Sequence, residues 1–359
     1  MQNGCNVSEQ MIVIDGSQGE GGGQVLRTAV GLAAALGRAV KVERIRARRP
    51  KPGLRPQHLA AVRAAAAVCD AGPLDAEVGS TELVLRPGEV RAGEYRFDIG
   101  TAGSTTLVLQ TVLPALLLAE GDSQVTVTGG THNPLAPCFE YLRDVFALPA
   151  AAMNCQLYLE MPRAGFYPKG GGEVRLNVRG VGSPDNLDPL LLGRRAALRH
   201  IEGISAASRS LPAHIIERQT SQVLGRLASA GHRASVEQAG WPTHSPGTAV
   251  FLRATFANTV GGCFALGKRG KPAERVADEA VDALLAFIAS PAALDAHAAD
   301  QLLTLAALCP RESRFSTERV TDHLRTNAAV IEQTTGRSVH IEKGEGPSAT
   351  VTVTEARPA

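Results

Sequence analysis

Polar, glycine-rich and hydrophobic positions follow one another along the chain in an order that occurs twice. In each copy an aspartate is followed by a glycine-rich loop and then by a long apolar run that ends at glycine. The copies read IDGSQGEGGGQVLRTAVGLAAALG at 14–37 and FDIGTAGSTTLVLQTVLPALLLAEG at 97–121. Because glycine commonly ends a helix, each apolar run is predicted to be a helix that begins after its glycine loop.

A second helix is predicted at a similar distance in both copies, over 55–70 and 135–148, and strand-like segments such as 82–85 and 125–128 lie between the helices. A third, degenerate copy is predicted to use helices at 274–289 and 321–335. The spacing of the copies is far longer than the roughly 20–50 residues of solenoid repeats. The pattern therefore predicts an α/β (α+β) fold, in which three repeated helix-backed four-stranded sheet units form a large domain.

Residues 187–272 interrupt the third copy with a strand, helix and strand pattern of their own. This segment begins in the turn-rich GVGSPDNLDP and ends in GKRGKPAE, and both compositions are typical of linkers. We expect a smaller inserted α/β domain at 187–272, with the large domain formed by 11–186 and 273–353.

Charge is nearly balanced over the 359 residues, with a net charge of +2, but one region is strongly basic. Between positions 41 and 55 the only acid is Glu43, against Lys41, Arg44, Arg46, Arg48, Arg49, Lys51 and Arg55. A solvated face is the plain interpretation of such a run, and an anion site is the functional one. Aromatic residues make up only 4% of the chain, so stacking platforms for a long single strand are not expected.

The six cysteines are scattered without a CxxC pair or metal-like spacing, which is typical of reduced thiols and predicts a cytoplasmic protein. The longest apolar stretch, 107–119, is interrupted by Gln110 and Pro114. It is also shorter than the ~20 residues that cross a bilayer, so no association with a membrane is expected.

The loop GSQGEGGG at 16–23 has the composition of a phosphate-binding loop, yet it matches neither GxxxxGK[ST] nor GxGxxG. It carries a carboxylate, Glu20, where a lysine would be usual. Close packing of two elements would also explain the glycines. The acid favours a site for a divalent cation, because Mg²⁺ commonly combines one or two carboxylates with phosphate oxygens.

Three other segments contain residues that are candidates for binding or catalysis. RPKPGLRPQHL at 49–59 leads into a helix whose first turns present Gln57 and His58, and arginine forks match phosphate oxygens. GFYPKGGGEV at 165–174 resembles the first glycine loop, although a hairpin turn in the third sheet is the favoured interpretation. On the helix predicted at 321–335, His323 and Asn327 share a face, but a lone helical histidine is more often structural.

Taken in order, these motifs resemble those of the RNA 3′-terminal phosphate cyclases. The resemblance extends from Met11 to about Val353, and its motifs are GSQGEGGGQ, RxxRxKPGLxxQHL, GTAGSTTLVLQTVLPALL, GGTHNPLAP, GFYPKGGG, ADQLL and HLRTN. It implies a large domain of three repeated helix-backed sheets with a smaller inserted domain, in agreement with the pattern analysis.

The resemblance also implies an activity and a set of site residues. Members of the family use ATP and a divalent metal, Mg²⁺ or Mn²⁺, to convert an RNA 3′-phosphate into a 2′,3′-cyclic phosphate through a histidine–AMP intermediate and an RNA adenylate. On this basis His323 is the expected nucleophile and Glu20 the metal-associated acid. The resemblance implies that phosphates of the nucleotide or RNA are bound by Arg27, Arg46, Arg49, Gln57 and His58. It implies that the adenosine site is lined by Gln110, Pro137, Asp300 and Gln301. The family places a tyrosine before ADQL, where this chain has His297, which puts adenine stacking there in doubt.

Two alternatives belong to other classes of protein. A non-catalytic relative that binds RNA during ribosome assembly would have the same fold without the nucleophile, so His323 argues against it. An enolpyruvyl transferase would need six repeated units, for which the chain is too short. The expected partners are ATP and an RNA with a 3′-phosphate end. The sequence leaves the oligomeric state open, with a homodimer as one alternative.

Overall fold

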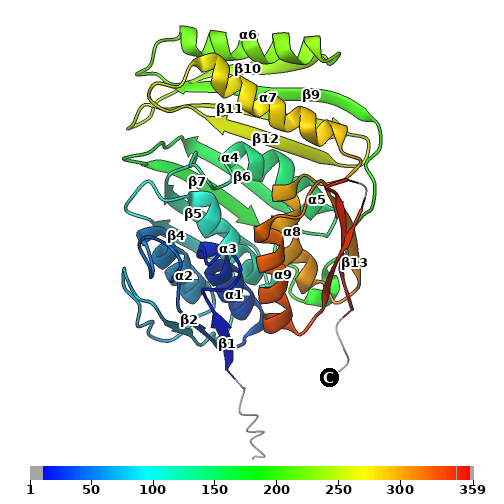
Figure 1. The fold of residues 1–359 in the computed structure, drawn as a ribbon. Coiled ribbons are helices and arrows are strands. Elements are labelled where there is room, and N and C mark those ends of the chain that lie inside the picture. Colours follow the sequence, from blue (N-terminus) through cyan, green and yellow to red (C-terminus); the bar gives the residue numbers. More distant parts are fainter. Residues whose placement is uncertain (1–10, 345, 356–359) are drawn as a thin grey trace, which may run out of the picture.

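The computed structural model of the chain describes residues 11–344 and 346–355. It contains a large unit built from three sheets and a smaller unit built from a fourth sheet, which lies at one end of the molecule (Figure 1). Helices and mixed sheets recur throughout, so the predicted α/β fold is confirmed.

The first repeat is a sheet in the order β1-β2-β3 backed by two helices. Strands β1 and β2 run parallel, so the helix between them crosses over one face of the sheet. This sheet has three strands among the described residues, and not the four that were expected. Its elements are β1 (Ile12–Asp15), α1 (Gly23–Leu36), β2 (Val40–Glu43), α2 (Pro56–Val68) and β3 (Leu83–Leu85).

The second repeat has a four-stranded sheet in the order β4-β5-β7-β6. The helix predicted over 135–148 begins later and is divided into α4, a π-helical turn and α5. The loop at 165–172 connects β6 to β7, so the predicted hairpin exists but belongs to this sheet and not to the third. The elements are β4 (Glu94–Asp98), α3 (Thr105–Leu118), β5 (Ser123–Gly129), α4 (Phe139–Tyr141), η1 (Leu142–Phe146), α5 (Ala147–Ala151), β6 (Leu157–Arg163) and β7 (Gly172–Val178).

The third repeat has the strand order β14-β15-β13-β8 and is covered by α8 and α9. Its first strand, β8, comes before the small unit in sequence, so this repeat is split as predicted. The helix predicted over 321–335 is α9, and its partner is α8 and not the 274–289 helix. The elements are η2 (Pro184–Asn186), β8 (Leu191–Leu192), α8 (Ala296–Leu308), β13 (Ser313–Thr317), α9 (Asp322–Thr335), β14 (Val339–Lys343) and β15 (Ala349–Val353).

The small unit is a sheet in the order β10-β9-β11-β12, and α6 and α7 pack on it. Residues of α7 share a separate hydrophobic cluster with this sheet, so assigning the 274–289 helix to the third repeat is wrong. The division into domains at 187 and 272 stays a prediction. The elements are β9 (Leu198–Ser208), α6 (His214–Ser229), β10 (Ala234–Trp241), β11 (Thr248–Phe256), β12 (Val260–Leu266) and α7 (Ala273–Ala289).

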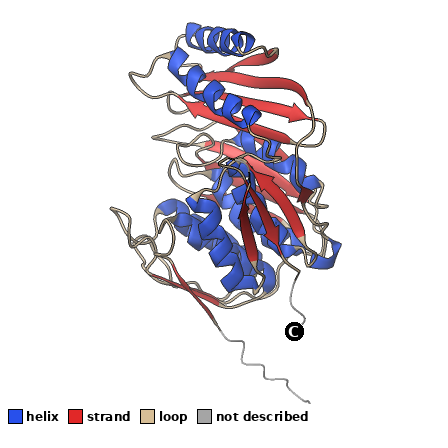
Figure 2. Ribbon diagram, turned by 45° about the vertical axis from the view of Figure 1, so that its right-hand side comes forward, coloured by secondary structure: helices blue, strands red, loops and turns tan. Residues whose placement is uncertain are grey.

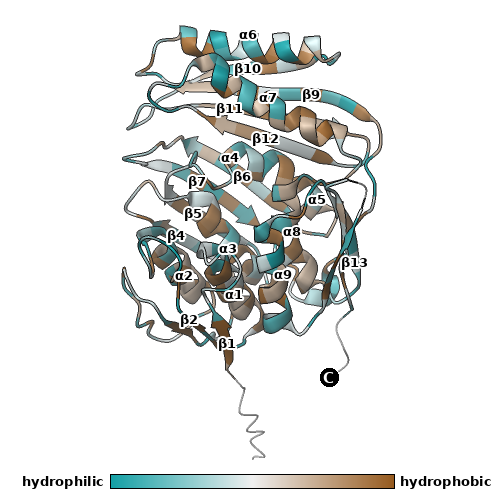
Figure 3. Cartoon of the chain, viewed as in Figure 1, coloured by the Kyte–Doolittle hydropathy of each residue, from teal (hydrophilic) through white to brown (hydrophobic). Residues whose placement is uncertain are grey.

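The helices of the three repeats pack against one another, and one hydrophobic core joins all three (Figure 2). At the closest approach of α1 to α3, a Cβ on Gly31 would lie 2.7 Å from the carbonyl oxygen of Thr111, so a larger residue does not fit. Figure 3 shows that α1 is largely hydrophobic, whereas α6 at the outer end carries many hydrophilic residues. Burial of apolar surface between the repeats is therefore the main force that fixes their arrangement.

The five cysteines in the described ranges are unpaired, and Cys5 lies outside the described residues. No helix in the described part of the chain combines the length and the apolar character that crossing a membrane requires.

Candidate active site

The loop at 16–22 connects β1 to α1 and lies against α9 of the third repeat. Gly19 and Gly21 have φ of +57° and +58°, a conformation that residues with a Cβ rarely adopt. A Cβ on Gly19 would also lie 2.1 Å from the Thr326 side chain. The glycines therefore allow the backbone to turn sharply and to approach α9 closely.

Glu20 on this loop connects His323 to the basic segment. Its Oε1 lies 3.1 Å from His323 Nδ1, and its Oε2 lies 3.2 Å from an Arg49 nitrogen. A Cβ on Gly22 would come within 2.7 Å of Glu20 Oε1, so this glycine leaves space for the carboxylate. The side chain of Glu20 is 17% exposed and that of His323 is 48% exposed, which leaves the other ring nitrogen of His323 accessible.

The contact between these two side chains shifts both pKa values. Burial alone would raise the pKa of Glu20, but the hydrogen bond to His323 and the charges of His323, Arg49 and Arg27 lower it overall. The hydrogen bond to Glu20 is the largest cause that raises the pKa of His323 above its ordinary value of 6.5. Since His323 Nδ1 donates to the carboxylate, the lone pair of the neutral ring lies on Nε2.

A cavity of about 470 Å³ lies beside His323, a size typical of small-molecule sites. Segments from all three repeats and from the small unit form its walls. The structure brings these predicted residues together in its lining: Arg27, Gln110, Pro137, His297, Asp300, Gln301 and His323. Within this set, the side chain of Gln110 donates a hydrogen bond to that of Gln301.

Asp300 is the buried carboxyl of the cavity. Burial raises its pKa to about 7, although the hydrogen bond from Thr321 and the charge of His323 lower it. Thr321 Oγ1 donates to Asp300 Oδ1 at 2.8 Å and also caps α9 by accepting from the Leu324 backbone. Asp300 is therefore held beside the first turn of the helix that carries His323.

Replacing Asp300 by asparagine is expected to stabilise the protein more at pH 8 than at pH 5. The folded protein holds the Asp300 proton up to about pH 7, whereas the unfolded chain releases it near 3.8, so the wild-type carboxyl loses stability as pH rises between these values. The gain at pH 8 is expected to exceed the gain at pH 5 by an amount on the order of 2 kcal/mol, or roughly 3 °C in Tm, in thermal unfolding without ligands.

Asp122→Asn is the matched control, because Asp122 is an exposed aspartate in the turn between α3 and β5. It should change Tm little at either pH. An Asp300→Asn effect of equal size at pH 5 and pH 8 would show that the buried carboxyl is not the source of the difference.

A chain of hydrogen-bonded side chains leads from Asp300 to the first turn of α1, which follows the glycine loop. The Asn327 side chain donates to the Asp300 carbonyl at 2.8 Å and accepts from Gln24 at 3.0 Å. Gln24 in turn accepts a hydrogen bond of 2.9 Å from Arg27. Asn327, on the helix face that it was predicted to share with His323, therefore contacts α1 and α8, and it helps to position Arg27 through Gln24.

His58 and Arg27 meet at Gly23, the first residue of α1. A Cβ on Gly23 would lie 2.4 Å from His58 Nε2 and 2.7 Å from an Arg27 nitrogen. Burial, with the charges of Arg27, Arg46 and Arg55, lowers the pKa of His58 to about 3, so its ring is neutral. Its Nδ1 accepts from the Arg55 backbone at 3.2 Å, which leaves a proton on Nε2. His58 therefore presents a neutral donor beside the cationic Arg27, whose pKa burial lowers only to about 10.

Arg46 and Gln57, also predicted to contact phosphates, are partly used by the protein itself. One nitrogen of Arg46 donates to the carbonyls of Lys51 and Gly53, at 2.7 and 3.0 Å. Gln57 Oε1 accepts from the Ser104 backbone at 2.7 Å and so connects α2 to the glycine loop of the second repeat. Both side chains shape the basic segment, whereas Arg49 and His58 lie directly beside the glycine loop.

Residues of the small unit also form part of the cavity, which the sequence analysis missed. Gly262, Cys263 and Phe264 on β12 line it. The Gly262 backbone donates to Asp295 Oδ2 at 3.2 Å, and the Tyr141 hydroxyl donates to Oδ1 of the same carboxylate. No motif in the sequence signals these contacts, because they depend on how the fourth sheet packs on the large unit.

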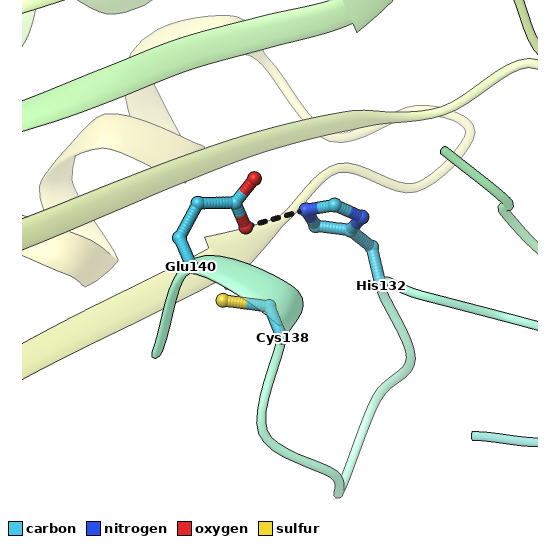
Figure 4. A group of neighbouring side chains, drawn as sticks. All are labelled: His132, Cys138 and Glu140. Atoms are coloured by element: carbon cyan, nitrogen blue, oxygen red, sulfur yellow. Dashed lines mark hydrogen bonds and ion pairs between the residues drawn. The ribbon is translucent and has the colours of Figure 1, made fainter. Parts of the chain in front are cut away.

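His132, Cys138 and Glu140 form a buried group whose ligating atoms lie within 4.8 Å of one another (Figure 4). The carboxylate of Glu140 lies 2.8 Å from His132 Nε2, and Thr131 Oγ1 lies 2.8 Å from Nδ1. Burial raises the pKa of the Cys138 thiol well above its ordinary value. These hydrogen bonds satisfy the imidazole and carboxylate, and the group fixes the 131–138 segment at one wall of the cavity.

A half-exposed histidine with a directed lone pair, next to a cavity and a glycine-rich loop, is an arrangement suited to nucleophilic catalysis. Comparison with known sequences specifies the family. The family model of RNA 3′-terminal phosphate cyclase matches residues 18–341. The chain belongs to the RNA 3′-terminal phosphate cyclase family.

Individual relatives cover nearly the whole chain. An RNA 3′-terminal phosphate cyclase of Methylococcus capsulatus is 49% identical over 330 residues, which are 90% of this chain and 91% of the relative. The protein of that name from Archaeoglobus fulgidus is 43% identical over 92% of this chain and 98% of its own. That from Methanopyrus kandleri is 43% identical over 96% of this chain and 98% of its own.

Proposed function

We propose that the protein uses ATP to convert an RNA 3′-terminal phosphate into a 2′,3′-cyclic phosphate, with His323 as the nucleophile. The observation that carries this proposal is the position of His323, which lines the cavity while Glu20 holds its Nδ1. This contact orients the ring and leaves the nucleophilic Nε2 toward the bound nucleotide.

The adenosine of ATP would occupy the cavity of about 470 Å³, between the 135–137 segment and α8. Gln110, Gln301 and Asp300 offer polar groups there, and Pro137 offers an apolar surface. His297, in the place of the family's tyrosine, lies edge-on to Tyr141 with ring centroids 6.2 Å apart. It would border the base as an imidazole and so replace part of the aromatic surface.

In the first step His323 Nε2 attacks the α-phosphorus of ATP, the bond to the β-phosphate oxygen breaks, and pyrophosphate leaves. Nδ1 keeps its proton, and the carboxylate of Glu20 stabilises the charge that develops on the ring. In the second step an oxygen of the RNA 3′-phosphate attacks the same phosphorus and the P–N bond breaks. The terminal 2′-hydroxyl then attacks the 3′-phosphorus, loses its proton to solvent and displaces AMP.

Glu20 also has the chemistry expected of a divalent-metal ligand. It is a carboxylate with a lowered pKa, and it has one Arg49 contact that a cation could replace. Mg²⁺ or Mn²⁺ bound there with phosphate oxygens would neutralise phosphate charge. The other phosphate contacts are proposed for Arg27, Arg49 and His58, with Arg46 and Gln57 holding the basic segment in place.

A cyclase-like binding protein without catalytic activity is the alternative. Such a protein has no need for a histidine whose ring is held by a carboxylate at the edge of a cavity. The arrangement of His323 and Glu20 therefore favours the enzyme.

The proposal is tested with three oligonucleotides that differ only at the end, incubated with ATP and Mg²⁺. A 3′-phosphate RNA should acquire a phosphatase-resistant cyclic end, and a 3′-hydroxyl RNA should not react. An RNA ending in a 2′-deoxy, 3′-phosphate nucleotide should accumulate as an adenylate about one nucleotide slower on a gel, because activation proceeds without closure. Closure needs no dedicated base, since a well-oriented neighbouring hydroxyl reaches effective molarities of ~10⁵ M or more.

Release of free AMP from the deoxy substrate without a trapped adenylate would show that activation and closure are one step. Failure of the 3′-phosphate RNA to cyclise, with the protein folded and ATP bound, would favour the binding-protein alternative.

A further inference from the structure

The loop GFYPKGGG between β6 and β7 is fixed in position by both units of the protein. Its Phe166 is 4% exposed, and the ring lies 5.3 Å from that of His132 and 6.2 Å from that of Trp241, between centroids. The Lys169 backbone donates to Ser245 Oγ at 3.0 Å. The loop is therefore anchored on the buried His132–Glu140 pair below it and on the β10–β11 connection beside it.

The glycines of this loop leave it a single conformation. Gly170 and Gly171 have φ of +65° and +71°, and a Cβ on Gly171 would lie 2.4 Å from the His244 ring. A Cβ on Gly170 would lie 2.8 Å from the Ala102 Cα. The backbone is thus close-packed on both sides, so the loop holds the Cα atoms between these anchors in place while their side chains reach solvent.

Tyr167 and Lys169 are the exposed side chains that this fixed loop presents. Tyr167 is 74% exposed, and Lys169 has no acidic partner among the described residues. A single exposed aromatic residue is common on protein surfaces. A tyrosine and an unpaired lysine two residues apart on a close-packed loop can bind a nucleotide, because the ring offers a stacking face and the ammonium a phosphate contact.

The loop is connected to the proposed phosphate site through the glycine loop of the second repeat. Gly170 packs on the 101–102 segment, which belongs to the glycine loop of the second repeat. In the same loop the Ser104 backbone donates a hydrogen bond to the Gln57 side chain, and Gln57 directly precedes His58 in the sequence. A continuous row of loops therefore leads from the residues that would hold the terminal phosphate to Tyr167 and Lys169.

We propose that Tyr167 and Lys169 form a binding site for an upstream nucleotide of the RNA strand, whose base stacks on Tyr167 and whose backbone phosphate contacts Lys169. This inference rests on the proposed function for the identity of the strand. The sequence analysis did not expect stacking on a long tract, and one tyrosine is consistent with that, because the site accommodates one nucleotide near the end.

The test measures binding of 3′-phosphorylated oligoribonucleotides of two to ten nucleotides by competition in fluorescence anisotropy, with Tyr167→Ala, Tyr167→Phe and Lys169→Ala. Wild-type affinity should rise over the first few nucleotides and then level off. Tyr167→Ala should remove that rise, weakening the ten-nucleotide RNA about 10-fold while leaving the dinucleotide unchanged, since stacking of one base contributes about 1–3 kcal/mol. Tyr167→Phe should bind like wild type, and Lys169→Ala should reduce both the rise and its salt dependence.

Tyr158→Ala is the matched control, because Tyr158 is 61% exposed on β6 of the same sheet but lies outside the row of loops. It should bind every RNA like wild type. Equal affinity of Tyr167→Ala and wild type for the ten-nucleotide RNA, or an equal loss at every length, would overturn the site. Covalent AMP transfer to the protein without RNA reports on the proposed function separately, and it should be unchanged in all four variants.

Discussion

His323→Ala is expected to abolish covalent attachment of AMP to the protein. With α-labelled ATP and Mg²⁺, the wild-type protein should keep label after denaturation, and the label should be lost in mild acid but resist alkali, as a phosphoramidate does. Loss of a nucleophile removes the whole covalent route, so the rate of cyclisation should fall by about three orders of magnitude or more. Because the His323 side chain is 48% exposed, the variant should fold normally.

The control for this experiment is His340→Ala. His340 is an exposed histidine on β14, a strand of the same repeat, and its loss should leave labelling unchanged. Equal labelling of His323→Ala and wild type would contradict the assignment and direct attention to His58 or His297.

Glu20 is expected to give the second largest effect, which combines a loss of rate with a change in pH dependence. Glu20→Ala should slow adenylation about 100-fold, because the ring of His323 loses the partner that orients it. Raising the concentration of Mg²⁺ should recover part of the loss if the carboxylate also holds the metal. Normal adenylation by Glu20→Ala at limiting metal would exclude both roles.

Glu20→Gln separates the charge from the hydrogen bond. The nucleophile is the neutral ring, so adenylation rises with pH as His323 loses its proton, and Glu20 raises the pKa of His323 above 6.5. Without the carboxylate charge this pKa falls, and the acid limb of the rate profile, measured from pH 5 to 9, should shift to lower pH. An unshifted limb would mean that His323 does not set the profile. Glu342→Gln, an exposed acid on β14, is the control.

Local features of the fold could be predicted from the sequence because their causes are local. Gly37 ends α1 in the left-handed conformation as predicted, whereas α3 ends at Leu118 with Ala119 as its C-cap, so the predicted end at Gly121 is wrong. The strand count of the first sheet and the partner of the 274–289 helix could not be predicted. They depend on which exposed faces pack together, and amphipathic periodicity does not specify a partner.

In the candidate site, too, some features could be predicted from local motifs, whereas others depend on contacts between distant segments. The residues carried by motifs, among them Arg27, Asp300 and His323, do line one cavity. Glu20 and His323 are in direct contact although they lie in the first and the third repeat, so no spacing in the sequence could indicate this contact. One nitrogen of Arg46 and the side-chain oxygen of Gln57 bond neighbouring backbone groups, which no motif indicated, and their phosphate contacts stay a prediction.

The contact of Gly262 with Asp295 limits how the small unit can be exchanged between relatives. Asp295 caps α8 by accepting from the His297 and Ala298 backbone, and it also receives the Gly262 N–H from β12. The small unit is therefore not a self-contained module, since one of its strands completes the wall of the cavity. A chimera that replaces 187–272 would transplant part of that wall and leave α7 behind on a foreign sheet. Boundaries for such grafts belong after α7, and the backbone N–H at position 262 must stay in place if the contact with Asp295 and the wall of the cavity are to be kept.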